Sequence, residues 1–331
     1  MNAYIKAISY YLPQNFVTNE DISKEFPKWT PEKIESKTGV KVRHVASIDE
    51  TAGDMAIKAA KKLFVEYNIE PSKIDFILLC TQSADYKLPS TACIIQNMLG
   101  VPTSAGALDF DLGCSGFEYG LAIAKGLIVG KMAKNVLLLT AETYNKYIHS
   151  QDFGNRTIFG DGAAATIIST EGDFKIGEFV FGTDGGGADK LIVRTGGHRY
   201  PNKLKDVRND ENGNIRSSDH LFMDGENLFA FMIEKVPELI HDVLKKNDII
   251  MEDVDEFVFH QVNKFLLTSL RKLCGIDKDK FYINVQQTGN TVSSSVPIAL
   301  KDYLESGGQS EIIMLAGFGV GLSWAGCILK K

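Results

Sequence analysis

Short apolar runs rich in β-branched residues alternate with helical patterns along this chain, and this alternation restricts the possible folds more than any other feature. Such runs are typical of strands that are covered on both faces of a sheet. They span residues 74–80, 107–112, 136–140, 163–168, 257–259 and 312–316. The helical patterns span residues 51–67, 90–99, 117–129, 228–244 and 296–306. The sequence therefore predicts an α/β fold built in layers.

The length of the chain and a weak internal repeat both predict two similar halves. With 331 residues, the chain exceeds the ~250 residues at which one hydrophobic core usually stops growing. Residues 74–82 resemble residues 254–262, and a further apolar strand follows late in each half. We place the boundary just after the strand that follows Gly160-Asp161-Gly162, which predicts halves of residues 1–171 and 172–331. Residues 183–219 lack periodicity, which predicts a long loop or flap.

The charge balance and the cysteines exclude several classes of protein. The chain has 36 basic and 42 acidic residues, a formal charge of −6, which argues against general attraction to nucleic acid or to membrane lipid. It starts without a secretory signal and has no apolar run of ~18 residues, so we expect a cytoplasmic protein without a membrane partner. The five cysteines are widely spread without CxxC pairs, so neither disulfides nor a metal site is expected.

Cys114 is the first candidate for chemistry. It follows the apolar residues 107–111 and precedes an amphipathic helical pattern, and glycines flank it at positions 113 and 116. A helix N-terminus favours the thiolate by ~0.3–1 kcal/mol when exposed and by up to ~2 kcal/mol when partly buried. The placement predicts a nucleophile, and a buried structural cysteine is the alternative.

His260 and Asn290 are the next candidates. His260 ends an apolar strand, the place where open α/β sheets bind ligands, although a structural histidine would also fit there. Asn290 lies in a small, polar run that leads into a helical pattern, where the alternative is a turn or helix-capping residue. Residues 316–324 then place three glycines at alternate positions between two apolar strands. Such a turn either brings backbone N–H groups close to a developing oxyanion or is simply a glycine-rich hairpin.

Together these motifs resemble the β-ketoacyl-acyl-carrier-protein synthase III family of the thiolase superfamily. The resemblance runs through nearly the whole chain. Its main motifs are Gly113–Phe117, His260–Asn263, Gly289–Thr291 and Gly317–Gly321, with further matches at Lys37–Val40, Leu88–Cys93, Phe159–Ala164 and Met223–Gly225.

The resemblance implies a fold, partners and a reaction. The fold would be the thiolase-like five-layered αβαβα fold of two similar halves. The chain would form a homodimer, bind no permanent cofactor, and admit the phosphopantetheine arm of coenzyme A or acyl carrier protein. An acyl group would be transferred to Cys114 and then condensed with a malonyl-acyl-carrier-protein as carbon dioxide leaves. This chemistry serves the biosynthesis of fatty acids or of specialised acyl chains.

The resemblance also implies roles for individual residues. His260 and Asn290 would donate hydrogen bonds to the malonyl thioester carbonyl, and the backbone N–H groups of Cys114 and Val320 would form the oxyanion hole. Leu88 would enter the acyl pocket of the partner subunit. The remaining substrate-binding candidates are Lys37, Arg156, Met223, Gly225, Asn263 and Phe318, of which the last four would line the tunnel. Lys264, Arg271 and Lys272 either dock the carrier protein or form a solvated surface.

The chain departs from the family pattern at the expected coenzyme A site. Lys33 stands where relatives that prime from acyl-CoA commonly carry an aromatic residue, and Trp29 is out of register. Arg156 is displaced relative to the arginine that contacts adenine in the family, and Val320 replaces a glycine. We therefore hypothesise that the enzyme serves a specialised acyl pathway or receives its primer from a carrier protein.

Two other functions use the same residues. A cysteine-dependent acyl-thioester hydrolase would also need a cysteine, a histidine and an asparagine, but Cys114 lacks a protease signature. A noncatalytic thiolase-fold partner subunit would normally have lost this cysteine. A thiolase would carry a second cysteine close to the terminal glycine motif, whereas Cys327 lies well beyond it.

Overall fold

The structure, a computed structural model, describes residues 1–210 and 214–331. Within these residues, nine strands form one sheet in the order β13-β14-β15-β8-β1-β7-β6-β4-β5. Their bounds are β1 Tyr4–Tyr11, β4 Phe76–Cys80, β5 Gly106–Phe110, β6 Asn135–Glu142, β7 Gly162–Ser169, β8 Phe174–Thr183, β13 Glu256–Phe259, β14 Ile312–Gly319 and β15 Ser323–Lys330. All six predicted strands are therefore confirmed.

The sequence analysis did not identify β1 and β8. Both strands alternate apolar with polar residues, and β8 buries Phe174, Ile176 and Phe179 while Lys175 and Glu178 face solvent. A search for continuous apolar runs passes over such half-buried strands.

The predicted helices are also confirmed, with small changes at their ends. They are α3 Ala52–Glu66, α4 Thr91–Leu99, α5 Gly116–Val129, α7 Gly225–Lys246 and α9 Ser295–Glu305. The start of α3 is fixed by a capping box in which Thr51 and Asp54 each bind the other's backbone N–H. Further helices are α1 Asn19–Glu25, α2 Pro31–Thr38, α6 Phe153–Arg156 and α8 Lys264–Leu273.

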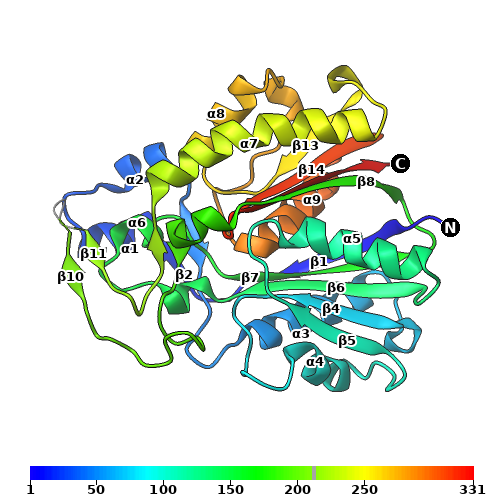
Figure 1. Ribbon diagram of the computed structural model, residues 1–331, viewed down its shortest axis with the longest axis horizontal. Helices are drawn as coiled ribbons and strands as arrows, with labels where there is room; N and C mark the ends of the chain where they lie inside the picture. Colours follow the sequence, from blue (N-terminus) through cyan, green and yellow to red (C-terminus); the bar gives the residue numbers. More distant parts are fainter. Residues whose placement is uncertain (211–213) are drawn as a thin grey trace.

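Helices and strands pack in five layers (Figure 1). The helices α3 and α4 cover the strands β1, β7, β6, β4 and β5, while α7 and α8 cover the other end of the sheet. Between them, α5 contacts β4, β6, β14 and β15, and α9 contacts β1, β7, β13 and β14. Three separate hydrophobic cores fill the spaces between the layers. This is the αβαβα arrangement that the resemblance implies.

The two ends of the sheet have the same local topology. In one, β4 pairs parallel with β6, which pairs antiparallel with β7; in the other, β13 pairs parallel with β14, which pairs antiparallel with β15. The pairing of β1 with β8 joins them. The boundary at residues 171 and 172 falls between β7 and β8, and the division there remains our proposal.

A cap lies at one end of the sheet, next to the turn between β14 and β15 (Figure 1). It contains α1, α2, α6 and the short strands β2 Phe16–Thr18, β3 Val42–His44, β9 Leu191–Ile192, β10 Arg208–Asn209, β11 Ile215–Arg216 and β12 Phe222–Met223. Much of it is the predicted loop of residues 183–219, which contains short paired strands as well as irregular backbone. Residues 211–213 of that prediction lie outside the described residues.

At the cap-side end of the sheet, the backbone around Gly160 in the first half lies in close contact with the backbone around Gly289 in the second half. Gly160 and Gly289 face each other: a Cβ on Gly160 would lie 2.2 Å from the Thr288 carbonyl oxygen, and one on Gly289, at φ +65°, would lie 2.6 Å from the Ile158 oxygen. The buried guanidinium of Arg43 donates to the Thr157 carbonyl nearby. Only glycines allow this contact.

We predict that Gly160→Ala lowers the free energy of unfolding by about 2 kcal/mol, because the added methyl group displaces backbone rather than a flexible side chain. Urea denaturation measures this change. Gly126→Ala is the matched control: Gly126 is exposed within α5 with open space around it, so alanine should stabilise by about 0.5–1 kcal/mol there. A Gly160→Ala protein as stable as wild type would contradict the prediction.

Candidate active site

Cys114 lies between the end of β5 and the start of α5, and its residue is 5% exposed. The end of β14 presses against it: a Cβ on Gly319 would lie 2.6 Å from the Cys114 Sγ. Gly319 is therefore required for the sulfur to occupy this position. The Ser115 and Ser323 hydroxyls, 2.7 Å apart, further tie the start of α5 to β15.

Two backbone N–H groups lie next to the Cys114 sulfur. The N–H groups of Val320 and of Cys114 itself bind the sulfur and favour its thiolate. Burial outweighs them and raises the pKa of the Cys114 thiol to about 12. The helix N-terminus favours the thiolate, as expected, but the removal of water from the charged form costs more free energy than the helix supplies.

His260 directly follows β13, and its backbone N–H continues the ladder by donating to the Ala316 carbonyl at 2.8 Å. The side chain is 1% exposed, and burial lowers the pKa of His260 to about 3. Its Nδ1 lies 2.6 Å from the Ser295 Oγ, which also accepts from the Gln261 N–H at 3.2 Å. We assign the Ser295 hydroxyl as the donor to Nδ1, so that the neutral ring carries its proton on Nε2. Among the described residues, Nε2 has no partner.

Asn290 is held by backbone bonds to the other half of the chain. Its N–H donates to the Ile158 carbonyl at 2.9 Å, and its carbonyl accepts from the Gly160 N–H at 3.0 Å. The side-chain Oδ1 accepts from the Val292 N–H at 2.8 Å, which fixes the orientation of the amide. The Nδ2 group has no partner in the part of the chain that the structure describes, so it remains available as a donor.

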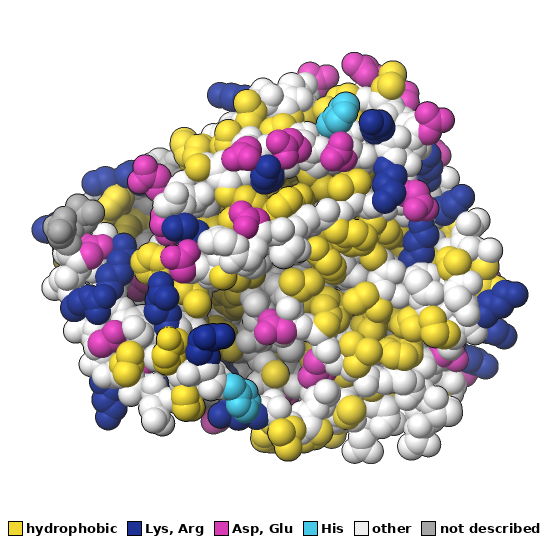
Figure 2. Space-filling model, in the orientation of Figure 1, with side chains coloured by type: hydrophobic (Ala, Val, Ile, Leu, Met, Phe, Trp, Pro, Cys, Tyr) yellow, Lys and Arg dark blue, Asp and Glu magenta, His cyan; other side chains and the backbone are white. Residues whose placement is uncertain are grey.

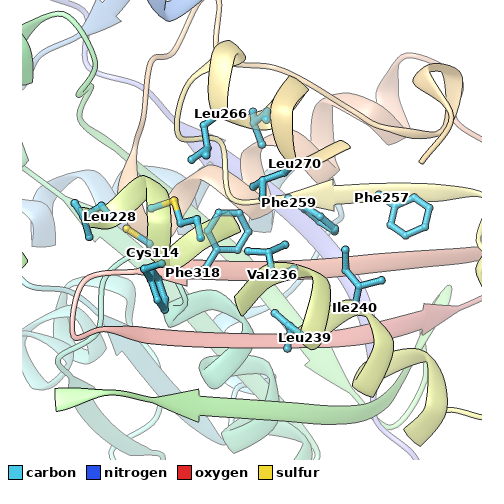
Figure 3. Close-up of a cluster of buried hydrophobic side chains, with 14 of the residues drawn as sticks. Cys114, Leu228, Val236, Leu239, Ile240, Phe257, Phe259, Leu266, Leu270 and Phe318 are labelled. Carbon is cyan, nitrogen blue, oxygen red and sulfur yellow. The ribbon is translucent and has the colours of Figure 1, made fainter. Parts of the chain in front are cut away.

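The packing brings the three candidates to one place. Phe318, beside Gly319, lies edge-on to the His260 ring with centroids 6.0 Å apart. The Val292 side chain, next to Asn290, reaches within 3.3 Å of where a Cβ on Gly113 would lie. Figure 3 shows Cys114 beside Phe318 at one end of the hydrophobic cluster that also contains Leu228 and Val236. A cysteine thus shares one enclosed region with an imidazole and an amide whose donors are free.

The predicted tunnel residues occupy different environments. Gly225, the first residue of α7, is exposed with open space around it, and Met223 in β12 is half-buried. The Asn263 side chain caps α8 by accepting from the Leu266 N–H. Phe318 is fully buried and contacts His260 and Phe259 instead of open space. Its assignment to the tunnel remains a prediction.

At the expected coenzyme A site, the structure shows neither a free aromatic face nor a free arginine. Trp29 stacks on Phe153 with centroids 4.5 Å apart, and the Lys33 and Lys37 ammonium groups lie 4.3 and 4.9 Å from its ring centroid. Arg156 makes a bidentate ion pair with Glu25 at 2.6 and 2.8 Å. Trp29 and Arg156 are therefore each in contact with other side chains of this chain.

Lys264 and Arg271 line one groove of about 830 Å³ between α2 and α8, together with Lys278 and Phe281. Glu32 and Glu35 lie on its opposite wall. Lys272 is not among the residues of this groove. Two of the three predicted docking residues are therefore brought together, while the third is not.

Sequence reasoning missed a polar network next to the site. Glu142, at the end of β6, is fully buried and accepts hydrogen bonds from the Gln82 N–H and from the Ser83 and Ser293 hydroxyls. Burial raises the pKa of Glu142 to about 8. Ser295 was missed in the same way, because the polar run 293–295 gave no sign of which hydroxyl would meet His260. A carboxyl directly after an apolar strand was the available signal for Glu142.

Among residues 1–210 and 214–331, no three His, Cys, Asp or Glu side chains lie close enough together to hold a metal ion. No helix of these same residues is both long and apolar enough to cross a membrane.

The five-layered fold with a cysteine at the start of a middle-layer helix defines the class: a condensing enzyme of the thiolase superfamily. Family models agree, since the model "3-Oxoacyl-[acyl-carrier-protein (ACP)] synthase III" matches residues 108–185 and its C-terminal counterpart matches residues 244–331. The chain belongs to the 3-oxoacyl-[acyl-carrier-protein] synthase III family.

Individual relatives extend this similarity over the whole chain. Beta-ketoacyl-[acyl-carrier-protein] synthase III of Clostridium perfringens is 36% identical over 99% of both chains. The enzyme of the same name from Caldanaerobacter subterraneus is 35% identical over 97% of this chain and 95% of its own. A crystal structure of a 3-oxoacyl-(acyl-carrier-protein) synthase III is 45% identical and superposes with a TM-score of 0.98 over 100% of both chains.

The buried His260 predicts a pH dependence of stability. Because its pKa is about 3 in the folded chain and 6.5 in the unfolded chain, only the unfolded state takes up the proton below pH 6.5. The contribution of His260 is therefore fully present above pH 6.5 and falls by about 1.4 kcal/mol between about pH 7.5 and 5.5.

His260→Gln removes the contribution of His260 to the pH dependence of stability but leaves the other titrating groups in place. Urea unfolding of both proteins at the two pH values measures the difference. An equal change of stability with pH in wild type and variant would contradict the assignment.

Proposed function

We propose that this protein is an acyltransferase of the β-ketoacyl-acyl-carrier-protein synthase III type, which joins an acyl group to a malonyl unit in the biosynthesis of fatty acids or specialised acyl chains. The observation that carries this proposal is the enclosed sulfur of Cys114, with two backbone N–H groups directed at it and the free donors of His260 and Asn290 on neighbouring segments.

In the first step, the Cys114 sulfur attacks the carbonyl carbon of an acyl thioester. The N–H groups of Cys114 and Val320 stabilise the tetrahedral oxyanion, and the carrier thiol leaves with the proton of the cysteine. Since burial keeps the resting cysteine protonated, loss of the proton accompanies attack.

In the second step, a malonyl thioester binds with its carbonyl oxygen toward the Nε2–H of His260 and the Nδ2–H of Asn290. Its carboxylate leaves as carbon dioxide, and the electron pair forms an enolate that both donors stabilise. The enolate carbon attacks the acyl-Cys114 carbonyl, the C–S bond breaks, and the sulfur regains a proton. A neutral His260 suits this role, because it needs to donate a hydrogen bond and not a charge.

We predict that the two steps separate by mutation. Cys114→Ala should abolish both acylation and condensation. His260→Ala and Asn290→Ala should keep acylation of Cys114 but lower malonyl decarboxylation by ~10²-fold or more, as expected when an oxyanion donor is lost. Intact-protein mass spectrometry follows acylation, and release of labelled carbon dioxide follows the second step. Release of free acid without a 3-oxoacyl product would instead identify a hydrolase.

We further propose that the primer arrives on a carrier protein. Phe153, Lys33 and Lys37 occupy the ring of Trp29, and Glu25 holds Arg156, so an adenine ring finds neither partner free. The groove with Lys264 and Arg271 offers positive charge to an acidic carrier helix instead. This part of the proposal concerns the molecule that delivers the acyl group and not the reaction at Cys114.

We therefore expect a given acyl group to acylate Cys114 at least about tenfold faster from acyl carrier protein than from coenzyme A. Glu25→Gln, which removes the charge that pairs with Arg156 but leaves its hydrogen bond to the Ser150 carbonyl, should raise the rate with acyl-CoA and leave the rate with the carrier unchanged. Rates from time-resolved mass spectrometry of the two donors decide the question: equal rates in the wild-type protein would refute a carrier-delivered primer.

We also propose a homodimer through the edge of the sheet. β5 pairs on one side only among the described residues and exposes Leu108, while the segment with Leu88, 83% exposed, is anchored to it through bonds from the Thr91 and Ala92 N–H groups to Asp109. An exposed apolar edge favours pairing with a second copy, which would place Leu88 in the partner subunit's acyl pocket. Sedimentation at the mass of a single 36.5 kDa chain would contradict this.

A further inference from the structure

A pocket of about 630 Å³ lies between the cap and the end of the sheet that carries the nucleophile. Val320, whose N–H binds the Cys114 sulfur, and Gln82 both line it. Their side chains meet at Gly113, where a Cβ would lie 2.5 Å from the Val320 Cγ1 and 2.6 Å from the Gln82 Oε1. Figure 2 shows this face of the molecule hollowed between the cap and α5.

The two walls of the pocket differ in chemistry. One wall is apolar and consists of Leu191, Ile192, Val193, Leu221 and Val320. The other carries hydroxyl, amide and charged groups, from Gln82, Asp111, Tyr144, Lys146, Tyr147, Thr195, Lys203 and Asp219. A pocket for a plain hydrocarbon chain needs no such polar wall, and pockets generally use a few placed polar groups to select their ligand.

A hydrogen-bonded network fixes the polar wall. The Tyr144 hydroxyl donates to the Gln82 Oε1 at 2.5 Å, and the Tyr147 hydroxyl donates to the Gln82 carbonyl at 2.7 Å. The Gln82 Nε2 donates to one carboxylate oxygen of Asp111 at 3.0 Å, and Glu142 accepts from the Gln82 N–H. Among the described residues, the second Nε2 hydrogen of Gln82 and the Oδ2 of Asp111 have no partner. The wall therefore presents one donor and one acceptor side by side.

We infer that this pocket selects an acyl group that carries a hydroxyl on its chain. The inference rests on the proposed function, since it names the primer of that reaction. A hydroxyl both accepts from the half-buried Gln82 amide and donates to the exposed Asp111, whereas a hydrocarbon chain that fills the pocket displaces water from both groups and replaces none of its hydrogen bonds. The charges of Asp111 and Asp219 are balanced in the lining by Lys146 and Lys203, which favours a neutral substituent over an amine or a carboxylate.

Matched thioesters test the inference directly. Hexanoyl groups with a hydroxyl at carbon 3, 4, 5 or 6 are compared, on one carrier protein, with the analogues that have a methyl group at the same carbon. We expect at least one hydroxyacyl group to acylate Cys114 about tenfold faster than its methyl analogue. The inference is overturned if every methyl analogue reacts as fast as its hydroxyacyl counterpart.

Variants of the polar wall show whether this network is responsible. Gln82→Met and Tyr144→Phe keep the size of the side chains but remove hydrogen-bonding groups, so the ratio of the hydroxyacyl rate to the methyl-analogue rate should fall toward one. Tyr11→Phe, which removes a hydroxyl bound to Glu50 outside the pocket, is the control and should keep the preference. A preference that survives both pocket variants would contradict the role of Gln82.

The result also separates the two proposals. If no thioester acylates Cys114 and no carbon dioxide leaves the malonyl carrier, the proposed function fails. If the methyl analogues acylate Cys114 and condense normally but outrun the hydroxyacyl groups, only the choice of primer is refuted.

Discussion

The contact between the end of β14 and the start of α5 is the constraint on which the rest of the site depends. β14 belongs to one end of the sheet and α5 begins next to the other, so their contact joins the two ends at the reactive sulfur. It requires glycine twice: a Cβ on Gly317 would lie 2.7 Å from the Cys114 carbonyl oxygen, and one on Gly319 would lie 2.6 Å from the sulfur. Because the backbone comes this close, the Val320 N–H reaches the sulfur, and His260 lies against the neighbouring Phe318.

Burial of the site also sets the protonation states of its ionisable side chains. Cys114, His260 and Glu142 are all buried away from bulk solvent, and each of these groups shifts toward its neutral form. For a reaction that develops negative charge on a carbonyl oxygen, neutral donors in a dry site are effective, since no water competes with them. Glu118, which is fully buried next to Gly317, follows the same rule, and burial raises its pKa far above the ordinary value.

Hydrogen bonds between the two halves fix the position of the Asn290 amide, and packing fixes the position of the Cys114 sulfur. The backbone of Asn290 is bound to Ile158 and Gly160, and Ser293 from the same segment donates to Glu142 of β6. Glu142 also holds Gln82, so the segment that carries Asn290 and the wall of the proposed primer pocket share one buried carboxyl. Under the proposed function, both binding steps would depend on this single polar network.

The sequence alone determined the layers and the reactive groups. Strands such as β6 and helices such as α5 follow from periodicity within a few residues, and Cys114, His260 and Asn290 stood out because each follows or precedes such an element. Tertiary structure alone decided the protonation of Cys114, the Ser295 contact that orients His260, the burial of Phe318 and the network around Gln82. Periodicity is a property of residues that are close together in the sequence. Desolvation and hydrogen-bond pairing depend instead on groups far apart in the chain that meet only after folding.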